Sequence, residues 1–291
     1  MKKLIVPVFV VIAAVAAVLV VHFVLQSSGR PAGATSRGTV ETIAFHSKAL
    51  QKTMQVDIYL PPGYSGSRTY PVLFFFHGKD SNAATPFTSL HMNTDADRLI
   101  ASGQIQPLII VSPEIDNSYG VNSATATSAA NGYSYGKYYD YLQQELIPYI
   151  EFHYPVSSQR SKHYIGGFSM GGFVALNIAL RNPSEFSKVG GHSAATWVNP
   201  NTVPALLMKQ ADSQLFQLAK TQDLSGMSFY FDCGTADVPY FIQGEKTLTQ
   251  TLKARHIPVQ LHSSPGQHDN AYWQSNASNY LLFYAGTHEH S

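Results

Sequence analysis

The sequence has few charged residues and no surplus of either sign. Asp, Glu, Lys and Arg make up 13% of the 291 residues, about half of the roughly 25% that is usual in globular proteins. Nineteen basic residues against 18 acidic ones leave a net charge of +1. No basic excess is therefore available to neutralise a phosphate backbone, and we expect no nucleic-acid partner.

The sequence also has little cysteine and no internal repeat. The single Cys233 excludes an intramolecular disulfide, a cysteine-based zinc site and an iron–sulfur cluster. Because no segment recurs at a fixed period, a solenoid or a propeller is not expected. Hydrophobic residues nevertheless make up 44% of the chain, which argues against a wholly disordered protein. A chain of this length can bury a large core in one or two domains.

The N-terminus carries the longest apolar run. Two lysines precede the uncharged, mostly apolar residues 4–25, and about 20 such residues suffice to cross a bilayer core. A secretory signal usually has a shorter apolar region, of roughly 7–15 residues. We predict a signal anchor or signal peptide over residues 1–25, with cleavage near residues 32–34 as the alternative. Both place the rest of the chain outside the cytoplasm, either attached to the membrane or secreted.

Residues 26–38 are rich in Ser, Gly, Pro, Ala and Thr, a composition typical of a flexible linker. We therefore predict that the globular domain spans residues 39–291.

Within this domain, strand patterns alternate with helical patterns. Residues 54–60 alternate polar and apolar side chains, as a half-exposed strand does, and the other strand patterns are continuous apolar runs. Continuous apolar strands suit a sheet that is buried on both faces, as parallel sheets are. The alternation predicts one three-layer α/β domain with a mostly parallel central sheet. The predicted strands are 54–60, 71–76, 108–111, 163–166, 228–231 and 259–261, and the predicted helices are 138–152, 172–180 and 244–254.

The predicted strand that ends at Gly166 continues into Gly167-Phe168-Ser169-Met170-Gly171, which matches G-x-S-x-G, and a helical pattern follows at once. In this strand–turn–helix context the glycines permit a tight turn that exposes the Ser169 hydroxyl at the end of the strand. The N-terminus of the helix favours negative charge that develops there. The sequence therefore predicts Ser169 as a nucleophile.

A nucleophilic serine needs a base, which in this kind of fold follows the serine and the acid in the chain. His268 lies in a loop directly after a predicted strand, and we predict it to be the base. We interpret His262, at the end of that strand, as a packed or surface residue. His192 follows a glycine pair and is a candidate pocket residue, while His288 and His290 belong to a polar tail.

The acid is expected between the nucleophile and the base. The strand over residues 228–231 is followed by Asp232-Cys233-Gly234-Thr235-Ala236-Asp237. Asp237 lies beyond the glycine turn, where it can hold the tautomer of the base. We favour Asp237 over Asp232, which is closer to the strand and is interpreted as orienting the loop or capping a turn. Asp223 precedes the strand, and Asp269 is adjacent to His268.

An oxyanion hole requires two N–H donors. Met170 follows the nucleophile and supplies one amide. The second is expected from the loop after residues 74–78, and we predict the amide of Lys79. We interpret His77, which precedes the nucleophile in the chain, as a structural residue beneath the hole.

Four motifs in series resemble the esterase D-like branch of the α/β-hydrolases, which includes S-formylglutathione hydrolases, feruloyl and acetyl-xylan esterases, and mycolyltransferases. The resemblance covers roughly residues 40–284. It implies a three-layer α/β-hydrolase fold, a Ser169–Asp237–His268 triad, the Lys79 and Met170 amides as oxyanion hole, and no metal or cofactor for the chemistry. The motifs are Leu60-Pro61-Pro62-Gly63-Tyr64, Tyr70-Pro71-Val72-Leu73 with His77-Gly78, Glu145-Leu146-Ile147-Pro148-Tyr149-Ile150, and Gly167-Phe168-Ser169-Met170-Gly171-Gly172.

These features predict an extracytoplasmic serine esterase that acts through an acyl-enzyme on a small-molecule or carbohydrate-linked ester. Residues 117–135, which are rich in Asn, Ser, Thr, Ala and Tyr, form either a loop beside the active site or a solvated surface loop. Residues 200–218 form either a cap over the pocket or a peripheral helix. Two other functions stay open: an acyltransferase that acts on cell-envelope glycan or lipid, and a non-catalytic binding protein tethered to the membrane.

Overall fold

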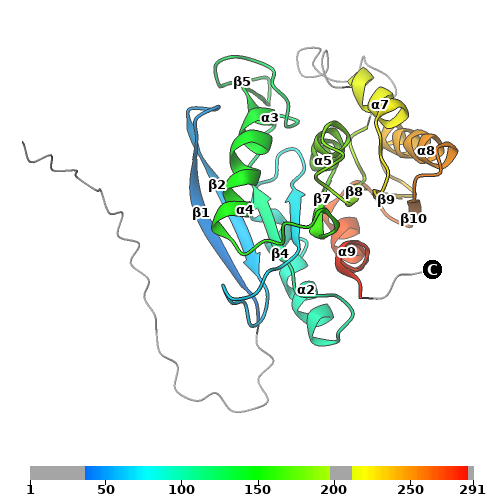
Figure 1. Cartoon of the computed structure of the whole chain (residues 1–291). Helices are drawn as coiled ribbons and strands as arrows, with labels where there is room; N and C mark the ends of the chain where they lie inside the picture. Colours follow the sequence, from blue (N-terminus) through cyan, green and yellow to red (C-terminus); the bar gives the residue numbers. More distant parts are fainter. Residues whose placement is uncertain (1–36, 197–211, 288–291) are drawn as a thin grey trace, which may run out of the picture. The chain divides into compact units, whose positions relative to one another are not determined.

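The computed structural model describes residues 37–196 and 212–287. Figure 1 shows its central eight-stranded sheet, whose strand order is β1–β2–β4–β3–β7–β8–β9–β10. β2 pairs antiparallel with β1 and β4, and the other pairs are parallel. The predicted mostly parallel sheet is therefore confirmed. The strands are β1 (Thr39–Ser47), β2 (Lys52–Leu60), β3 (Val72–Phe76), β4 (Ile109–Pro113), β7 (His163–Phe168), β8 (Lys188–His192), β9 (Ser228–Gly234) and β10 (Val259–Ser264), and a separate antiparallel hairpin joins β5 (Ser128–Ala130) to β6 (Tyr133–Tyr135).

The inner strands are buried on both faces. Every residue of β3, β4 and β7 is buried, as their continuous apolar sequences predict. The expectation of a buried strand is wrong for residues 259–261. β10 is an edge of the sheet, paired only with β9, and its residues are exposed or half-buried.

Helices cover both faces of this sheet. Phe74 and Phe76 of β3 belong to a hydrophobic cluster with α5 and the run α3–η1–α4. Leu73 and Phe75 face the other way, into a cluster with α2 and α9, which Figure 1 shows side by side. The three layers are thus confirmed. The helices are α1 (Thr85–Thr88), α2 (Met92–Ala101), α3 (Tyr138–Asp140), the π-helical turn η1 (Tyr141–Leu146), α4 (Ile147–His153), the 3₁₀ turn η2 (Arg160–Lys162), α5 (Met170–Arg181), α7 (Asp212–Thr221), α8 (Pro239–Ala254) and α9 (Asn270–Ala285).

The sequence pattern does not predict α9. Its aromatic, Asn and Ser residues have modest helix propensity, so the local sequence gives little signal. Tertiary packing compensates, because Tyr272, Trp273, Tyr280 and Tyr284 are all buried against the sheet cluster. Of these aromatic residues, Trp273 packs against His268 and Tyr280 stacks on the buried His192.

Some predicted segments lie outside the described residues. These are the signal anchor over residues 1–25, most of the linker over 26–38, and the first part of segment 200–218, whose remainder belongs to α7. Across residues 37–196 and 212–287, no helix combines the length and the hydropathy needed to cross a membrane.

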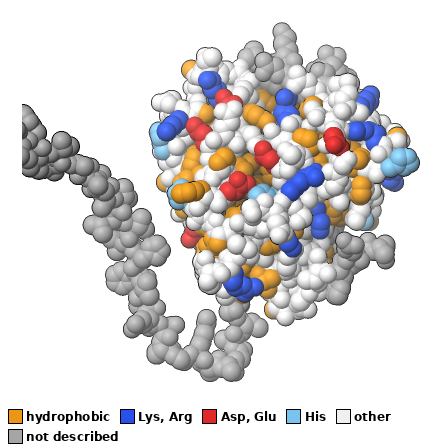
Figure 2. All heavy atoms as spheres, viewed as in Figure 1, with side chains coloured by type: hydrophobic (Ala, Val, Ile, Leu, Met, Phe, Trp, Pro, Cys, Tyr) orange, Lys and Arg blue, Asp and Glu red, His pale blue; other side chains and the backbone are white. Residues whose placement is uncertain are grey.

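Figure 2 shows one face of the molecule, on which Lys and Arg side chains are dispersed among Asp and Glu. Uncharged polar and hydrophobic groups separate them, in keeping with the low charge content of the sequence. This face presents no extended surface of one charge.

Candidate active site

Ser169 occupies a sharp turn between β7 and α5. Its φ of 55° and ψ of −121° lie in a region that a residue with a Cβ rarely adopts, which costs on the order of 1–3 kcal/mol. The flanking glycines make the turn possible by close packing. A Cβ on Gly171 would lie 2.1 Å from the Phe76 carbonyl oxygen, and one on Gly167 would lie 2.6 Å from it. The turn therefore has the geometry of a nucleophile elbow.

A chain of hydrogen bonds leads away from the Ser169 hydroxyl. Ser169 Oγ lies 2.8 Å from His268 Nε2, and His268 Nδ1 lies 2.8 Å from Asp237 Oδ1. Because an ionised carboxylate only accepts hydrogen bonds, Nδ1 carries the proton and Nε2 is left to accept from the serine. The structure thus brings together the predicted nucleophile, base and acid, which lie on three separate loops.

Asp237 is almost fully buried, with 5% of its surface exposed. Burial by itself raises the pKa of this carboxyl, but the hydrogen bonds from His268 and from the Val238 N–H outweigh it and hold the pKa below its usual value. Asp237 is therefore an anion at neutral pH, as a residue that stabilises an imidazolium must be.

Two aromatic residues restrict the imidazole of His268. The ring of Phe241, in α8, lies 5.1 Å from it, and Trp273 of α9 packs edge-on at 4.9 Å. Trp273 also packs against Phe168, the residue before the nucleophile, at 4.6 Å. Nothing in the local sequence marks either aromatic residue as a neighbour of His268, so neither could be identified before the fold was known.

The other candidate acid, Asp232, has a different partner. Its Oδ1 lies 2.8 Å from Nδ1 of His192, and its Oδ2 accepts a hydrogen bond from Tyr280 at 2.9 Å. His192 is completely buried and stacks on Tyr280, with ring centroids 3.5 Å apart. His192 is therefore not a pocket residue, and Asp232 anchors a buried network instead of orienting a loop.

The remaining alternatives are peripheral. His262 is exposed and stacks on Tyr230, as expected for a surface residue. Asp269 caps α9 by accepting the N–H of Tyr272, and Asp223 bonds Ser225.

The two predicted oxyanion donors belong to the elbow itself and to the loop beside it. Met170 is the first residue of α5, and Lys79 follows Gly78, at which a Cβ would lie 3.3 Å from the Cβ of Ser169. Among the described residues, neither amide donates a hydrogen bond to a protein acceptor. His77, predicted to be structural, is fully buried and bonds the Gly78 carbonyl oxygen and Glu114.

Glu245 of α8 is a buried carboxyl that the sequence analysis does not identify. Its Oε1 accepts the Ala194 N–H at 2.7 Å, and its Oε2 contacts Cys233 Sγ at 3.0 Å. Burial raises the pKa of Glu245 well above its usual value, which favours the protonated carboxyl. In the sequence it stands beside Lys246 in an amphipathic helix, where a glutamate is ordinarily solvated.

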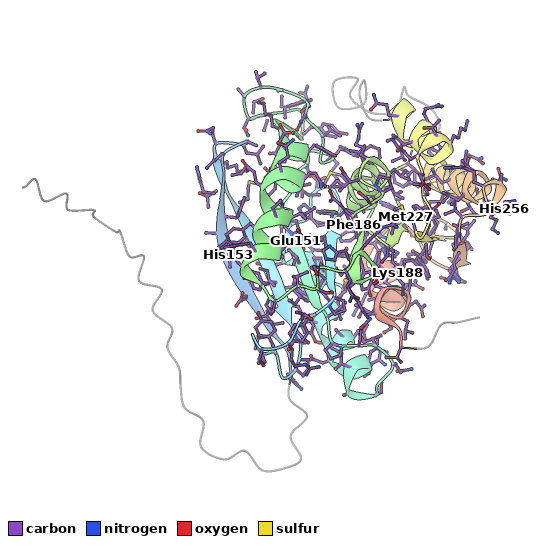
Figure 3. The ribbon with its side chains drawn as sticks, in the orientation of Figure 1. Glu151, His153, Phe186, Lys188, Met227 and His256 are labelled. Carbon is purple, nitrogen blue, oxygen red and sulfur yellow. The ribbon has the colours of Figure 1, made fainter. Side chains whose placement is uncertain are left out.

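A surface cavity of about 420 Å³ lies at the other end of β7. It is lined by His163, the first residue of the strand, and by Glu151, which is labelled in Figure 3 on α4. Six residues of strand, about 20 Å, separate this end of β7 from Ser169. The cavity is thus distinct from the candidate site.

The chain matches the Esterase family model, described as "Putative esterase", over residues 47–283. In sequence it is similar to an endo-1,4-beta-xylanase/feruloyl esterase of Xylanibacter ruminicola, with 27% identity over 168 residues, which are 56% of this chain and only 22% of that protein. In structure it is similar to a ferulic acid esterase, with a TM-score of 0.73, 25% identity, and coverage of 86% of this chain and 98% of the other. An S-formylglutathione hydrolase of Staphylococcus aureus gives a TM-score of 0.65 at 22% identity, with coverage of 86% and 97%.

The family match spans most of the chain and includes Ser169, Asp237 and His268. The resemblance found in the sequence motifs is thereby confirmed. This chain belongs to the Esterase family of α/β-hydrolases, and the match supports the sequence-based prediction of a serine carboxylic ester hydrolase.

Proposed function

We propose that this protein is a serine esterase that hydrolyses carboxylic esters through an acyl-enzyme, with Ser169 as nucleophile, His268 as base and Asp237 as orienting acid. The observation that carries the proposal is the continuous hydrogen-bond chain from Ser169 Oγ to Asp237, with 2.8 Å at each step. A hydroxyl at an elbow, bonded to an oriented imidazole, is the arrangement that nucleophilic catalysis requires.

In the acylation step, Ser169 Oγ attacks the ester carbonyl carbon while its proton passes to His268 Nε2. The carbonyl oxygen becomes an oxyanion, which the amides of Met170 and Lys79 stabilise as hydrogen-bond donors. When this intermediate collapses, the bond to the alcohol oxygen breaks and His268 protonates the departing alcohol. The acyl group stays on Ser169.

In the deacylation step, a water molecule gives a proton to His268 Nε2 and attacks the acyl carbon. The second oxyanion collapses, the bond to Ser169 Oγ breaks, and the serine recovers its proton from His268 as the carboxylic acid leaves. Asp237 stabilises the imidazolium in both steps. A hydroxyl acceptor in place of water would make the same site an acyltransferase.

For the substrate, we propose an ester that joins an aromatic acid to a carbohydrate. The names of the ferulic acid esterase and of the Xylanibacter relative support this class. Aromatic side chains also stand near the predicted oxyanion loop, because Lys79 Nζ lies 5.3 Å from the ring centroid of Tyr133, which stacks on Tyr119. The apolar N-terminal run supports a location outside the cytoplasm.

The experiment that tests the proposal treats the full chain, purified in detergent, with a small fluorophosphonate and measures the intact mass. We expect one covalent adduct on the wild type, none on Ser169→Ala, and an unchanged adduct on Ser161→Ala, an exposed serine used as a matched control. Ester hydrolysis should fall at least about a thousandfold in Ser169→Ala.

The same proteins are then assayed with methyl ferulate, a feruloylated arabinose ester and p-nitrophenyl acetate, with and without a free sugar as acceptor. Hydrolysis of the aromatic esters supports the substrate class, whereas acylated sugar as main product would favour the acyltransferase. A folded wild type that forms no adduct and hydrolyses no ester would contradict the proposed triad and favour the binding-protein alternative.

A further inference from the structure

The loop that follows β3 carries the proposed oxyanion donor, the N–H of Lys79. A trans peptide is planar, and its C=O and N–H point in opposite directions. The direction of the Lys79 N–H is therefore set by whatever holds the Gly78 carbonyl. The next peptide, between Lys79 and Asp80, is joined to it at the Lys79 Cα, so whatever holds the Asp80 N–H limits how far the first peptide can turn. The structure shows a distinct contact on each side.

His77 holds the Gly78 carbonyl. His77 Nδ1 lies 2.8 Å from Gly78 O, and since a carbonyl oxygen only accepts hydrogen bonds, Nδ1 is the donor. The other ring nitrogen lies 3.0 Å from Glu114 Oε1 and 3.1 Å from the Ile115 N–H, so the buried ring has partners at both nitrogens. This contact fixes one side of the Gly78–Lys79 peptide.

Asn117 holds the backbone on the other side. Asp80 has a φ of 60°, in the left-handed region that residues other than glycine adopt infrequently. The side chain of Asn117 contacts this residue twice, because its Oδ1 accepts the Asp80 N–H at 2.8 Å and its Nδ2 donates to Asp80 Oδ1 at 2.8 Å. Asp80 is itself bonded to Lys79 Nζ at 2.7 Å.

Asn117 also connects this loop to the β5–β6 hairpin. Its Nδ2 donates to Gly132 O at 2.9 Å, and its own carbonyl oxygen accepts the Ser134 N–H at 3.1 Å. The Asn117 side chain therefore joins the hairpin to the left-handed Asp80. Because Asp80 follows Lys79, the same side chain is connected to the peptide of Lys79. Segment 117–135 is attached to the oxyanion loop and is not merely a solvated surface loop.

We propose that Asn117 is a positioning residue that holds Asp80 in its left-handed conformation and thereby keeps the Lys79 N–H directed at the oxyanion. This inference rests on the proposed function. Asn117 touches no reacting atom, so its removal should weaken stabilisation of the transition state while leaving ground-state binding largely intact.

The test compares Asn117→Ala with Asn122→Ala in the full chain. Asn122 is a matched control, because it makes the same pair of contacts to another aspartate. Its Nδ2 donates to Asp140 Oδ1 at 2.8 Å, and its Oδ1 accepts the Asp140 N–H at 3.2 Å. Asp140, however, belongs to α3 and not to the oxyanion loop.

We expect kcat to fall by roughly 10- to 100-fold in Asn117→Ala, less than the full loss of one oxyanion donor, with KM changed less than about threefold. The inhibition constant of a trifluoromethyl ketone, whose adduct carries an oxyanion, should rise in parallel with the fall in kcat/KM. Asn122→Ala should change neither quantity by more than about twofold.

A charge-swapped double variant tests the contact directly and guards against a folding defect. Asn117→Asp alone places two carboxylates together and should lower kcat. Adding Asp80→Asn gives the carboxylate of residue 117 an N–H donor in the side chain of residue 80, so part of kcat should return.

The outcomes separate this inference from the proposed function. Wild-type kcat in Asn117→Ala, or equal losses in both alanine variants, would overturn the positioning role while Ser169-dependent hydrolysis stands. Failure of the wild type to hydrolyse any ester in a Ser169-dependent way would overturn both.

Discussion

Asp232 and Asp237 show how two carboxylates on one strand and its loop acquire different partners. Asp232 lies within β9, fully buried, and pairs with His192. Asp237 lies beyond the strand and pairs with His268. Both aspartates are buried, but only His268 also bonds the Ser169 hydroxyl. The roles are therefore set by what the partner histidine touches.

This difference gives a prediction at the residue scale. Asp237→Asn should lower kcat by on the order of 10³–10⁴-fold, because the wrong tautomer of His268 is then favoured, with little change in stability. Asp232→Asn should instead lower the free energy of unfolding by roughly 1–3 kcal/mol, because a buried hydrogen bond is broken, and kcat of the folded protein should stay within about tenfold. Steady-state kinetics and urea unfolding measure both. The reverse pattern would assign the catalytic acid to Asp232.

Glu245 gives a second prediction, on pH. Burial raises its pKa well above the usual value, so the folded state keeps a proton that the unfolded chain releases above about pH 4.3. The contribution of Glu245 to the free energy of unfolding is therefore most favourable below that pH. It declines as the pH rises towards the pKa of the folded state, by up to about 1.4 kcal/mol per pH unit. Glu245→Gln keeps an acceptor for the Ala194 N–H and has no proton to lose.

Urea unfolding at pH 5, 6 and 7 measures this effect. Relative to the wild type, Glu245→Gln should be more stable at pH 7 than at pH 5. Parallel stability curves for the two proteins would show that Glu245 is ionised in the folded state.

At the scale of elements, glycines in β7 and β8 leave the space that the Tyr284 side chain of α9 occupies. A Cβ on Gly166 would lie 1.8 Å from the hydroxyl oxygen of Tyr284, and one on Gly190 would lie 1.9 Å from it. The same hydroxyl lies 3.2 Å from Nε2 of the buried His192. The helix is therefore seated on the strand that leads into the nucleophile elbow.

Gly166→Ala should accordingly lower the free energy of unfolding by about 1–3 kcal/mol, as overpacking of a core does. Adding Tyr284→Phe removes the closest atom and should recover part of the loss, since the nearest remaining atom would lie 2.8 Å away. Gly66→Ala, where a Cβ meets nothing within 4 Å, is the matched control and should be nearly neutral. Equal effects at Gly66 and Gly166 would contradict this account of the packing.

At the scale of the whole molecule, the parallel sheet gathers the candidate groups. Ser169 follows β7, Asp237 follows β9, His268 follows β10 and Lys79 follows β3. The carboxyl ends of parallel strands share one edge, which is where open α/β sheets bind ligands. A site built from distant segments is the direct result of this topology.

The N-terminal segment gives the prediction at this scale. We expect the full chain to fractionate with membranes, because its apolar run is long enough to span a bilayer, and residues 36–291 to remain in the soluble fraction. The kcat/KM of the two should agree within about twofold, since the described sheet begins at Thr39 and the Gly38 N–H bond to Asp97 is retained. A full chain recovered only in the soluble fraction, with residues 1–36 still present, would contradict the anchor.

The sequence by itself determined the features that depend on neighbouring residues. Most of the buried strands, the strand–turn–helix around Ser169 and the chain order of the predicted nucleophile, acid and base are all local or ordinal properties, and a linear pattern records them. The family resemblance rests on the same short motifs, which is why it could be identified without coordinates.

Only the tertiary structure decided what depends on contacts between distant segments. Ser169 and His268 are 99 residues apart, and His192 and Asp232 are 40 apart. Asp232 meets His192 because the register of β8 against β9 places them opposite each other, whereas Asp237 meets His268 because both lie in loops after neighbouring strands. The aromatic residues around His268, the buried Glu245 and the contact of Asn117 with Asp80 likewise have no sequence signal. Their roles arise from burial and hydrogen bonding, which exist only once the strands have been placed side by side.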